Sequence, residues 1–289
     1  MMALNKKGWA RPITIAIVAI LVTILVLNVM STKSEPTLSN NNLEAPSNDN
    51  ESIDKFVFAR NQLSYKLNIA RREIGKLECE MSKGKKITSN HGGWCKDAST
   101  ETGGQHLTDK VFVPHLSSFL KDKTVGSFGD GPGAYKREIT KLQEVRLYDA
   151  YDGAPYSEEN SKGTVKFLDL TIPQYGIPVY DWIISLEVAE HIPQEFESTY
   201  LDNIFRHAKE GIILSWAIPG QGGLQHVNNK PLEYVIQVME KNGFVRNENL
   251  SKKLQKAATF PWLKRNINVY LRTNYSTFGS EKRLVQWFS

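Results

Sequence analysis

The sequence lacks a concentrated basic stripe, a Cys/His metal motif and an internal repeat. Its 36 Lys and Arg residues outnumber its 31 Asp and Glu residues, which gives a net charge of +5, but the basic residues are scattered. A nucleic-acid interface needs a basic patch or stripe, so no nucleic-acid partner is expected. Cys79 and Cys95 are the only cysteines, and no Cys/His spacing indicates zinc, so no metal is expected.

One long uncharged run is present, from Ile13 to Met30. At about 1.5 Å per residue it is long enough to cross a bilayer core. Basic residues precede it, so the positive-inside rule places a tail, residues 1–12, in the cytoplasm and the rest of the chain across the membrane. A cleaved signal peptide is the alternative, but its apolar core is shorter and ends in a small-residue cleavage site, which Asn28 to Ser31 matches poorly. We therefore expect a transmembrane signal anchor at 13–30.

The predicted topology is that of a single-pass type II membrane protein. The short span suits the thinner membranes of the endoplasmic reticulum and Golgi, with the folded domain in the lumen. In that oxidising compartment Cys79 and Cys95 can pair, although two free buried thiols fit the sequence equally well.

The segments after the anchor differ in composition. Residues 31–52 are rich in Ser, Asn, Pro and Glu and are predicted to form a flexible stem. Residues 53–120 are predicted to form a helical extension and cap, with helices over Ile53 to Met81 and His106 to Leu120 and a loop over Lys83 to Gly104. The first helix carries apolar residues at spacings of three, four and seven: Phe56, Leu63, Leu67, Ile74 and Leu77. We expect this stripe to pack on the main domain; a membrane-surface or coiled-coil role is the alternative.

The main domain, residues 121–275, alternates strand-like and helix-like segments and precedes a C-terminal tail, 276–289. The predicted strands are Thr124–Phe128, Val145–Tyr148, Thr164–Leu168, Trp182–Leu186 and Gly211–Trp216, and the predicted helices are Ala134–Leu142, Gln194–Ala208 and Pro231–Asn242. This alternation indicates an α/β fold with a Rossmann-like, doubly wound, mostly parallel sheet. Ile267 to Leu271 alternates like an antiparallel edge strand and comes last.

A glycine loop follows the first predicted strand. Gly129, Gly131 and Gly133 end the apolar run and precede a helix. Glycine permits positive φ and close approach of a ligand to the backbone, and a helix start offers free N–H groups. The pattern therefore predicts a cofactor-binding loop; an ordinary turn is the alternative.

Acidic residues follow the next strands, where a doubly wound sheet binds its ligands. Asp152 lies about twenty positions past the glycine loop, a spacing that suits hydrogen bonds from ribose hydroxyls, with Asp149 as the reserve. Asp169 follows the third strand and is placed to accept from an adenine amino group. Each acid alone fits a helix cap or turn as well. Four such strand ends in order favour a ligand site.

From Lys121 to Arg272 the chain resembles the class I S-adenosylmethionine-dependent methyltransferases. The most specific match is L-E-V-x-E-H-I-P at residues 186–193, after the fourth strand. Residues 211–220 resemble the family's fifth strand and its loop, and 241–244 resemble the Gly-Phe after its next helix. Residues 214–223 with 226–228 look like a poorly characterised, here membrane-anchored, branch of this superfamily.

The resemblance implies an S-adenosyl-L-methionine site formed by Gly129, Asp130, Gly131, Gly133, Asp152, Asp169, Leu170 and Glu187. The glycines would approach the methionine part and ribose, Asp152 would hold the ribose hydroxyls, and Asp169 and Leu170 would flank the adenine. The family often has an acid two positions before the first glycine, where this chain has Ser127; Asp130 is the candidate substitute. A dinucleotide-binding dehydrogenase is disfavoured because its fingerprint is G-x-G-x-x-G, whereas the spacing here is G-x-G-x-G.

Methyl transfer to oxygen gains from a general base. His226, in a glycine-rich loop after the fifth strand, is the first candidate, followed by His191 and His106; a packing or surface role is the alternative for each. His91 and Trp94 lie in the predicted cap.

The sequence thus predicts a membrane-anchored, lumenal O-methyltransferase acting on a glycan or another secretory-pathway acceptor. A lipid or small-molecule methyltransferase is one alternative, because the anchor keeps the site near a bilayer. A non-catalytic methyltransferase-like binding domain is the other, motivated by Ser127.

Overall fold

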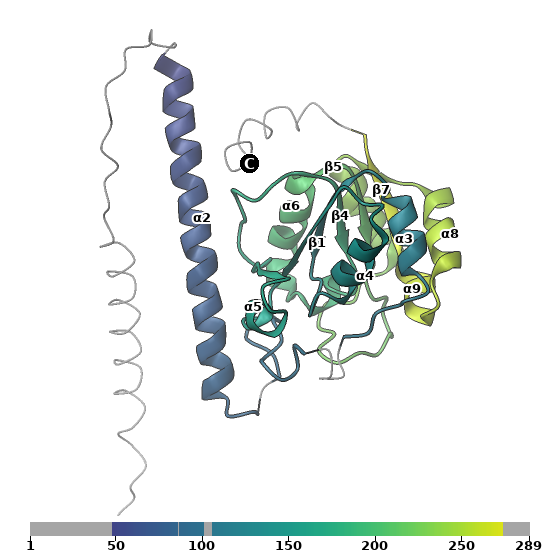
Figure 1. The fold of residues 1–289 in the computed structure, drawn as a ribbon, viewed down its shortest axis with the longest axis horizontal. Coiled ribbons are helices and arrows are strands. Elements are labelled where there is room, and N and C mark those ends of the chain that lie inside the picture. Colours follow the sequence, from purple (N-terminus) through teal and green to yellow (C-terminus); the bar gives the residue numbers. More distant parts are fainter. Residues whose placement is uncertain (1–47, 86, 101–105, 274–289) are drawn as a thin grey trace, which may run out of the picture. The chain divides into compact units, whose positions relative to one another are not determined.

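A computed structural model of the protein describes residues 48–85, 87–100 and 106–273 (Figure 1). The predicted cytoplasmic tail, the anchor at 13–30, most of the stem and the tail 276–289 lie outside these ranges. Within the described ranges, no helix combines the length and the apolar character that crossing a bilayer requires.

A seven-stranded sheet forms the centre of the described domain. Its strands are β1 (Thr124–Phe128), β2 (Leu147–Asp152), β3 (Lys166–Phe167), β4 (Tyr180–Ser185), β5 (Ala208–Leu214), β6 (Phe244–Arg246) and β7 (Asn268–Arg272). They lie in the order β3-β2-β1-β4-β5-β7-β6. The pairings among β1 to β5 are parallel, whereas β7 is antiparallel to both β5 and β6. The predicted Rossmann-like, mostly parallel sheet with an antiparallel end is confirmed.

Helices cover both faces of the sheet (Figure 1). The helices of the described ranges are α2 (Asn48–Met81), α3 (Val113–Phe119), α4 (Ala134–Leu142), α5 (Ser157–Asn160), α6 (Glu197–His207), α7 (Leu232–Lys241), α8 (Glu248–Ala257) and α9 (Pro261–Asn266), with 3-10 turns η1 (Ala189–His191) and η2 (Gln194–Phe196). One apolar core joins the sheet to α6 and α7, and a second joins it to α3, α4, α8 and α9. These two cores are the physical basis of the doubly wound arrangement.

Two predicted elements differ from the observed ones near the edges of the domain. The segment predicted as an antiparallel edge strand is antiparallel, but β7 lies between β5 and β6, and the short β6 forms the edge. The helix predicted over His106 to Leu120 is restricted to α3. An Asp109 carboxylate accepts a hydrogen bond from Phe112 N (3.1 Å) in the turn before it, and a proline at the helix start fixes where α3 begins.

Helix α2 packs on the domain through a different face from the predicted one. The apolar stripe points to solvent, with Phe56 76% and Leu63 67% exposed. The packed face is polar: Ser64 Oγ donates to Pro173 O (3.2 Å) and Asn68 Nδ2 donates to Phe167 O (3.0 Å). Loops after β3 leave backbone carbonyls that need donors, and this polar face supplies them. The predicted helix therefore packs on the domain, but most of its apolar stripe faces solvent instead of forming the contact.

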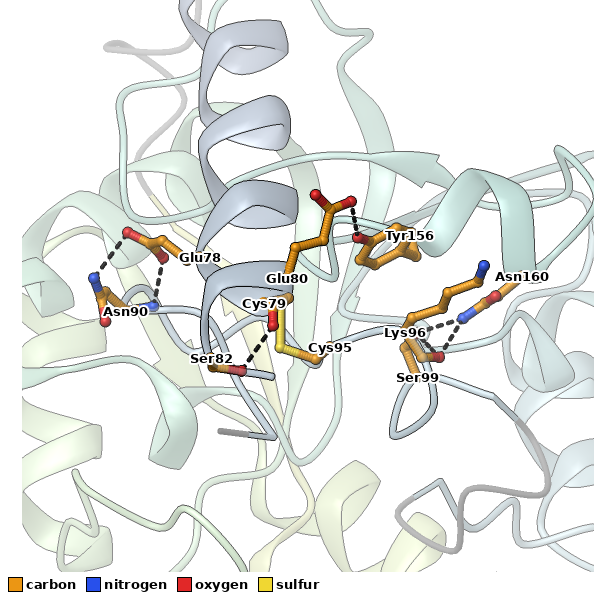
Figure 2. Close-up of a disulfide and its surroundings, with 10 residues drawn as sticks. All are labelled: Glu78, Cys79, Glu80, Ser82, Asn90, Cys95, Lys96, Ser99, Tyr156 and Asn160. Atoms are coloured by element: carbon orange, nitrogen blue, oxygen red, sulfur yellow. Dashed lines mark hydrogen bonds between the residues drawn. A yellow bond between two sulfur atoms is a disulfide. The ribbon is translucent and has the colours of Figure 1, made fainter. Parts of the chain in front are cut away.

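A disulfide between Cys79 and Cys95 ties the end of α2 to the following loop (Figure 2). Glu78 strengthens the same junction, because its carboxylate accepts hydrogen bonds from Asn90 N (2.9 Å) and Asn90 Nδ2 (2.8 Å). Within the loop, Ser89 N donates to Gly93 O (2.7 Å). The pairing that the sequence left open is thus present, and it holds the segment around His91 to Trp94 in place.

Candidate functional site

The strand order of the sheet reverses at β1. Strand β1 pairs with β2 on one side and β4 on the other, so the chain leaves their carboxyl ends in opposite directions. A cavity of about 760 Å³ opens there, lined by loops that follow β1, β2, β3, β4 and β5 and by the segment His91 to Trp94. This volume is in the range of cofactor and ligand sites.

The glycine loop after β1 needs its glycines for both conformation and space. Gly129, Gly131 and Gly133 have φ of 94°, 59° and 83°, in the left-handed region that side chains disfavour. A Cβ at Gly129 would overlap Val188, and one at Gly131 would lie 2.7 Å from Nδ1 of His106. The loop therefore brings bare backbone to the cavity wall.

Asp130 places a carboxylate beside Ser127, near the end of β1. Its Oδ1 accepts hydrogen bonds from Ser127 Oγ (2.6 Å) and from Tyr148 OH (3.0 Å). Burial raises the pKa of Asp130 to about 6, although both hydroxyls favour its charged form. Strand β1 has Ser127 and no carboxylate at this point, and the glycine loop supplies the carboxylate of Asp130 three residues later.

Asp152 is oriented by backbone donors at the end of β2. Its Oδ2 accepts from Gly131 N (2.8 Å) and its Oδ1 from Ala154 N (2.7 Å), and the residue lines the cavity. The reserve candidate, Asp149, lies earlier in β2 and accepts a hydrogen bond from Tyr180 OH (2.9 Å). Asp149 is outside the cavity lining, so Asp152 is the acid that the structure brings to the glycine loop.

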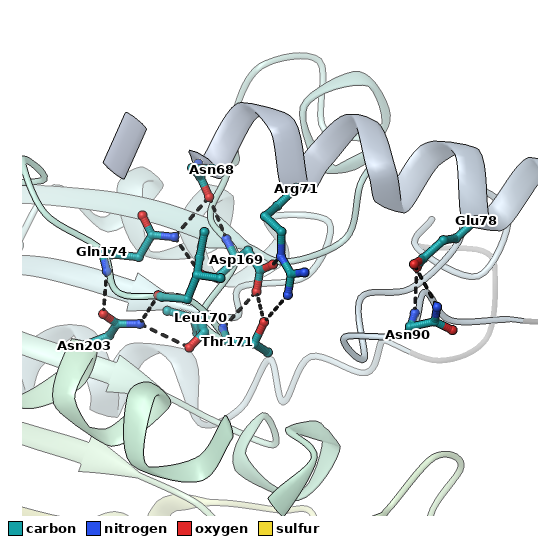
Figure 3. Close-up of polar contacts among 10 residues, drawn as sticks. Asn68, Arg71, Glu78, Asn90, Asp169, Leu170, Thr171, Gln174 and Asn203 are labelled. Carbon is teal, nitrogen blue, oxygen red and sulfur yellow. Dashed lines mark hydrogen bonds and ion pairs between the residues drawn. The ribbon is translucent and has the colours of Figure 1, made fainter. Parts of the chain in front are cut away.

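Asp169 lines the cavity, but its carboxylate is already engaged (Figure 3). Oδ2 forms an ion pair with Arg71 Nε of α2 (2.8 Å), and Oδ1 accepts from Thr171 N (2.8 Å) and Thr171 Oγ1 (2.6 Å). Asn68 accepts from the backbone N–H of Asp169 (2.9 Å). These contacts differ from the expected adenine contact: they make the carboxylate an anchor for its loop, and Leu170 remains on the cavity wall.

We expect an Arg71→Met variant to loosen this loop. Removing the guanidinium leaves the largely buried Asp169 carboxylate without its cation, which costs about 1–3 kcal/mol of stability. Urea unfolding of Arg71→Met and of Arg72→Met measures the difference. Arg72, the next residue of α2, pairs with Glu158, whose side chain is 39% exposed, so its loss should cost less than about 1 kcal/mol. Equal destabilisation by both variants would contradict the anchoring function of Arg71.

Glu187 turns the chain sharply where β4 ends. Its φ of 56° is unusual for a residue with a side chain, and such strain is common at functional sites. Ser215, beyond β5, accepts from Glu187 N (2.7 Å) and donates to Glu187 Oε1 (2.7 Å). Burial raises the pKa of the Glu187 carboxyl. Glu187 therefore presents to the cavity a carboxyl group that Ser215 holds in place.

Three histidines of the cavity lining gather around Trp94, and one of them, His106, lies against Gly131 of the glycine loop. The Trp94 ring meets His106 and His191 edge-on, with centroids 6.0 and 5.6 Å apart, and His191 lies 5.1 Å from His226. Burial lowers the pKa of all three, and together with the neighbouring His226 it lowers that of His191 to about 4. The three imidazoles are thus neutral at pH 7, and each can accept a proton.

Sequence reasoning missed the contributions of Asn68, Arg71 and Tyr148 to the site. Tyr148 ends a predicted strand, and the sequence offers no sign that its hydroxyl reaches Asp130. The two α2 residues lie about a hundred positions before the loop that they hold. The available signal in the sequence was the polar face that α2 carries beside its apolar stripe, on which Asn68 and Arg71 lie.

No protein-family model and no curated protein matches the chain. Solved structures similar to it include magnesium protoporphyrin IX methyltransferase from Synechocystis PCC 6803 with bound SAH, at 16% identity and TM-score 0.44, covering 61% of this chain and 97% of that one. Another is 1,6-didemethyltoxoflavin-N1-methyltransferase from Burkholderia thailandensis with S-adenosylhomocysteine, at 15% identity and TM-score 0.42, covering 61% and 85%. The likeness to class I S-adenosylmethionine-dependent methyltransferases concerns the fold alone.

Proposed function

We propose that the protein is an S-adenosylmethionine-dependent methyltransferase. The observation that carries the proposal is the pair of carboxylates, Asp130 within the glycine loop and Asp152 hydrogen-bonded to that loop, at the point where strand order reverses. The cavity there has space for the cofactor, and the loop offers backbone that a Cβ would obstruct. The residues present therefore fit the cofactor in their chemistry.

In this proposal each polar part of the cofactor has a partner in the chain. Asp130 holds the ammonium group, Asp152 accepts from the ribose hydroxyls, and Leu170 packs against the adenine. When bound, S-adenosylmethionine supplies a methyl group on a positively charged sulfur, so the protein needs mainly to align and desolvate the acceptor. Trp94, which is 9% exposed, limits water at the acceptor end. A neutral histidine there accepts the proton of an acceptor hydroxyl.

We further propose that the acceptor is a sugar hydroxyl of a secretory-pathway glycan. The predicted anchor and stem support this, as does the Cys79–Cys95 disulfide, because disulfides persist in oxidising compartments. The same features support a type II protein of the endoplasmic reticulum or Golgi. Protease treatment of intact microsomes tests the topology: digestion of the domain in sealed vesicles would place it in the cytosol and remove the argument for a glycan.

Two measurements test the function. Isothermal titration should detect S-adenosylmethionine binding, and absence of binding at millimolar cofactor would overturn the methyltransferase proposal. Transfer of a radiolabelled methyl group to a glycan library tests the acceptor. Label that enters only lipids or small amines would contradict the glycan assignment and leave the methyl-transfer proposal in place.

Cofactor affinity should fall in acid because of Asp130. Burial raises its pKa from 3.8 to about 6 in the folded protein, so protons compete with the cofactor's ammonium group below about pH 6. The dissociation constant should rise up to about tenfold per pH unit there and level off near pH 7. The contribution of Asp130 to the free energy of unfolding changes in the opposite direction. Its raised pKa contributes stability below pH 4, and this stability is lost as the pH rises through 6. Titration calorimetry between pH 5 and 8 checks the affinity; Asp130→Asn should bind weakly with no such pH dependence, and an equal slope in both proteins would exclude Asp130.

A further inference from the structure

Two of the cavity histidines belong to a cluster with the composition of a metal site. Glu190 and His191 belong to the short turn η1 after β4, and His226 comes from the loop after β5. Each offers a ligand atom, and these atoms all lie within 4.8 Å of one another. We propose that Glu190, His191 and His226 bind a divalent first-row transition metal ion.

The first support is the environment of Glu190. Its exposed fraction is 0%, the Glu187 carboxyl is an acidic neighbour, and within the described ranges no Lys or Arg side chain pairs with its buried carboxyl oxygens. A buried polar group without a partner is costly, and a buried charge more so unless it is paired or coordinates a metal. The nearest basic group is Nε2 of His226, 4.0 Å from Oε1 of Glu190. A cation bound between them supplies what the carboxylate lacks.

The second support is the orientation of His191. Its Nδ1 lies 3.1 Å from the carbonyl oxygen of Gln225. A carbonyl oxygen can only accept, so Nδ1 carries the proton and Nε2 keeps its lone pair. Metal-binding histidines are commonly fixed in this way by a backbone carbonyl. The ring is therefore set as a ligand through Nε2.

The third support is how His226 is held beside Glu190. The next two backbone N–H groups, of Val227 and Asn228, donate to the carbonyl oxygen of Glu190 (2.9 and 3.0 Å). Gly223 packs against the His226 ring so closely that any Cβ there would overlap it. Nδ1 of His226 is buried without a partner in the described ranges. Backbone contacts thus fix the spacing of two ligands that lie in different loops.

The ligand set narrows the choice of metal. Two imidazoles with one carboxylate suit Mn²⁺, Fe²⁺, Co²⁺ or Zn²⁺, whereas Mg²⁺ and Ca²⁺ prefer oxygen ligands. At bond lengths of about 2.0–2.2 Å and tetrahedral or octahedral angles, neighbouring ligands of one ion lie roughly 3.0–3.6 Å apart, so closure from separations of up to 4.8 Å needs movements of roughly 1–2 Å. Three protein ligands leave coordination positions open.

One consequence rests on the proposed methyl transfer. An open position can take an acceptor oxygen and lower the pKa of its hydroxyl, so that His226 need not serve as the base. The acceptor proton then passes to solvent, the oxygen forms the new bond to the methyl carbon, and the sulfur keeps the electron pair of the broken S–C bond. His106 stays outside the trio as the free imidazole.

Co²⁺ titration of the full-length, tag-free chain in detergent, after removal of metals with a chelator, tests the site. Wild type should develop the visible absorption of Co²⁺ bound by nitrogen and oxygen ligands. Glu190→Gln and His226→Gln should weaken Co²⁺ binding at least about 100-fold. Gly223→Ala, which displaces the His226 ring, should also weaken it. Gly222→Ala is its matched control, because a Cβ there meets nothing within 4 Å, and His106→Gln controls for binding by any cavity histidine.

The outcomes separate the two proposals. Unchanged Co²⁺ affinity in Glu190→Gln, or equal losses in His106→Gln and His226→Gln, would overturn the metal site; such results fit a protonated Glu190 shared with Glu187. Titration of each variant with S-adenosylmethionine in the absence of metal shows that it is folded. Wild type that binds Co²⁺ but not the cofactor would refute the methyltransferase proposal alone, and the reverse result would refute the metal site alone.

Discussion

Replacement of Gly131 by arginine should abolish S-adenosylmethionine binding, with no heat detected at millimolar cofactor. The backbone N–H of Gly131 holds Asp152, and a Cβ at this position would lie 2.7 Å from Nδ1 of His106. The arginine side chain therefore has to enter the space proposed for the cofactor. The domain should still fold, because a single non-glycine residue at φ of 59° costs only about 1–2 kcal/mol.

A matched control separates backbone strain from obstruction of the cavity. Gly163 also has a positive φ, of 78°, but a Cβ there meets nothing within 4 Å. Gly163→Ala should lose a similar amount of stability and keep full cofactor affinity, as measured by thermal unfolding and titration calorimetry. Unchanged affinity in Gly131→Arg would mean that the cofactor binds elsewhere.

The second large effect is expected on stability, when the Cys79–Cys95 bond is removed. The bond joins residues 16 apart in sequence, and closing a loop of this size is worth about 3 kcal/mol in the chain-entropy model. The double variant Cys79→Ser/Cys95→Ser should therefore unfold at lower denaturant concentration by that free energy. Cofactor affinity should change less, because Asp152 and the glycine loop are held by their own hydrogen bonds.

Reducing agent provides the control within the same experiment. It should destabilise wild type to the level of the double serine variant and have no effect on the variant itself. If the variant were as stable as oxidised wild type, the loop around His91 to Trp94 would be held by its hydrogen bonds alone, and the disulfide would be dispensable.

The elements that could be predicted from sequence are those with strong local signals. The bounds of β1 and α4 were predicted correctly, because an apolar run, a glycine loop and a helical period follow one another without interruption. The insertion of β7 between β5 and β6 could not be predicted in this way. Alternation of apolar residues in Ile267 to Leu271 indicates an antiparallel strand but does not name its neighbours, which are chosen by contacts distant in sequence.

The residues of the candidate site divide in the same way, into those with a local sequence signal and those placed by contacts distant in sequence. The acids after the strands could be proposed from spacing alone, because parallel strands end at one edge of the sheet. The engagement of Asp169 by Arg71 depends on which face of α2 meets the domain, and the apolar pattern pointed to the wrong face. The adjacency of Glu190 and His191 is visible in the sequence, but the arrival of His226 beside them depends on a loop whose path is fixed only by tertiary hydrogen bonds.

Helix α2 also sets a length. Two of its attachments are Arg71, which pairs with the loop after β3, and Cys79, which is bonded to the loop that carries Trp94. These two residues are about 12 Å apart along the helix axis, at about 1.5 Å per residue. The helix therefore fixes the distance between these two loops, which both line the cavity. Inserting a single residue between Arg71 and Cys79 would lengthen this part of the helix by about 1.5 Å and rotate one end by roughly 100°. The ion pair of Arg71 and the disulfide of Cys79 could then no longer form together.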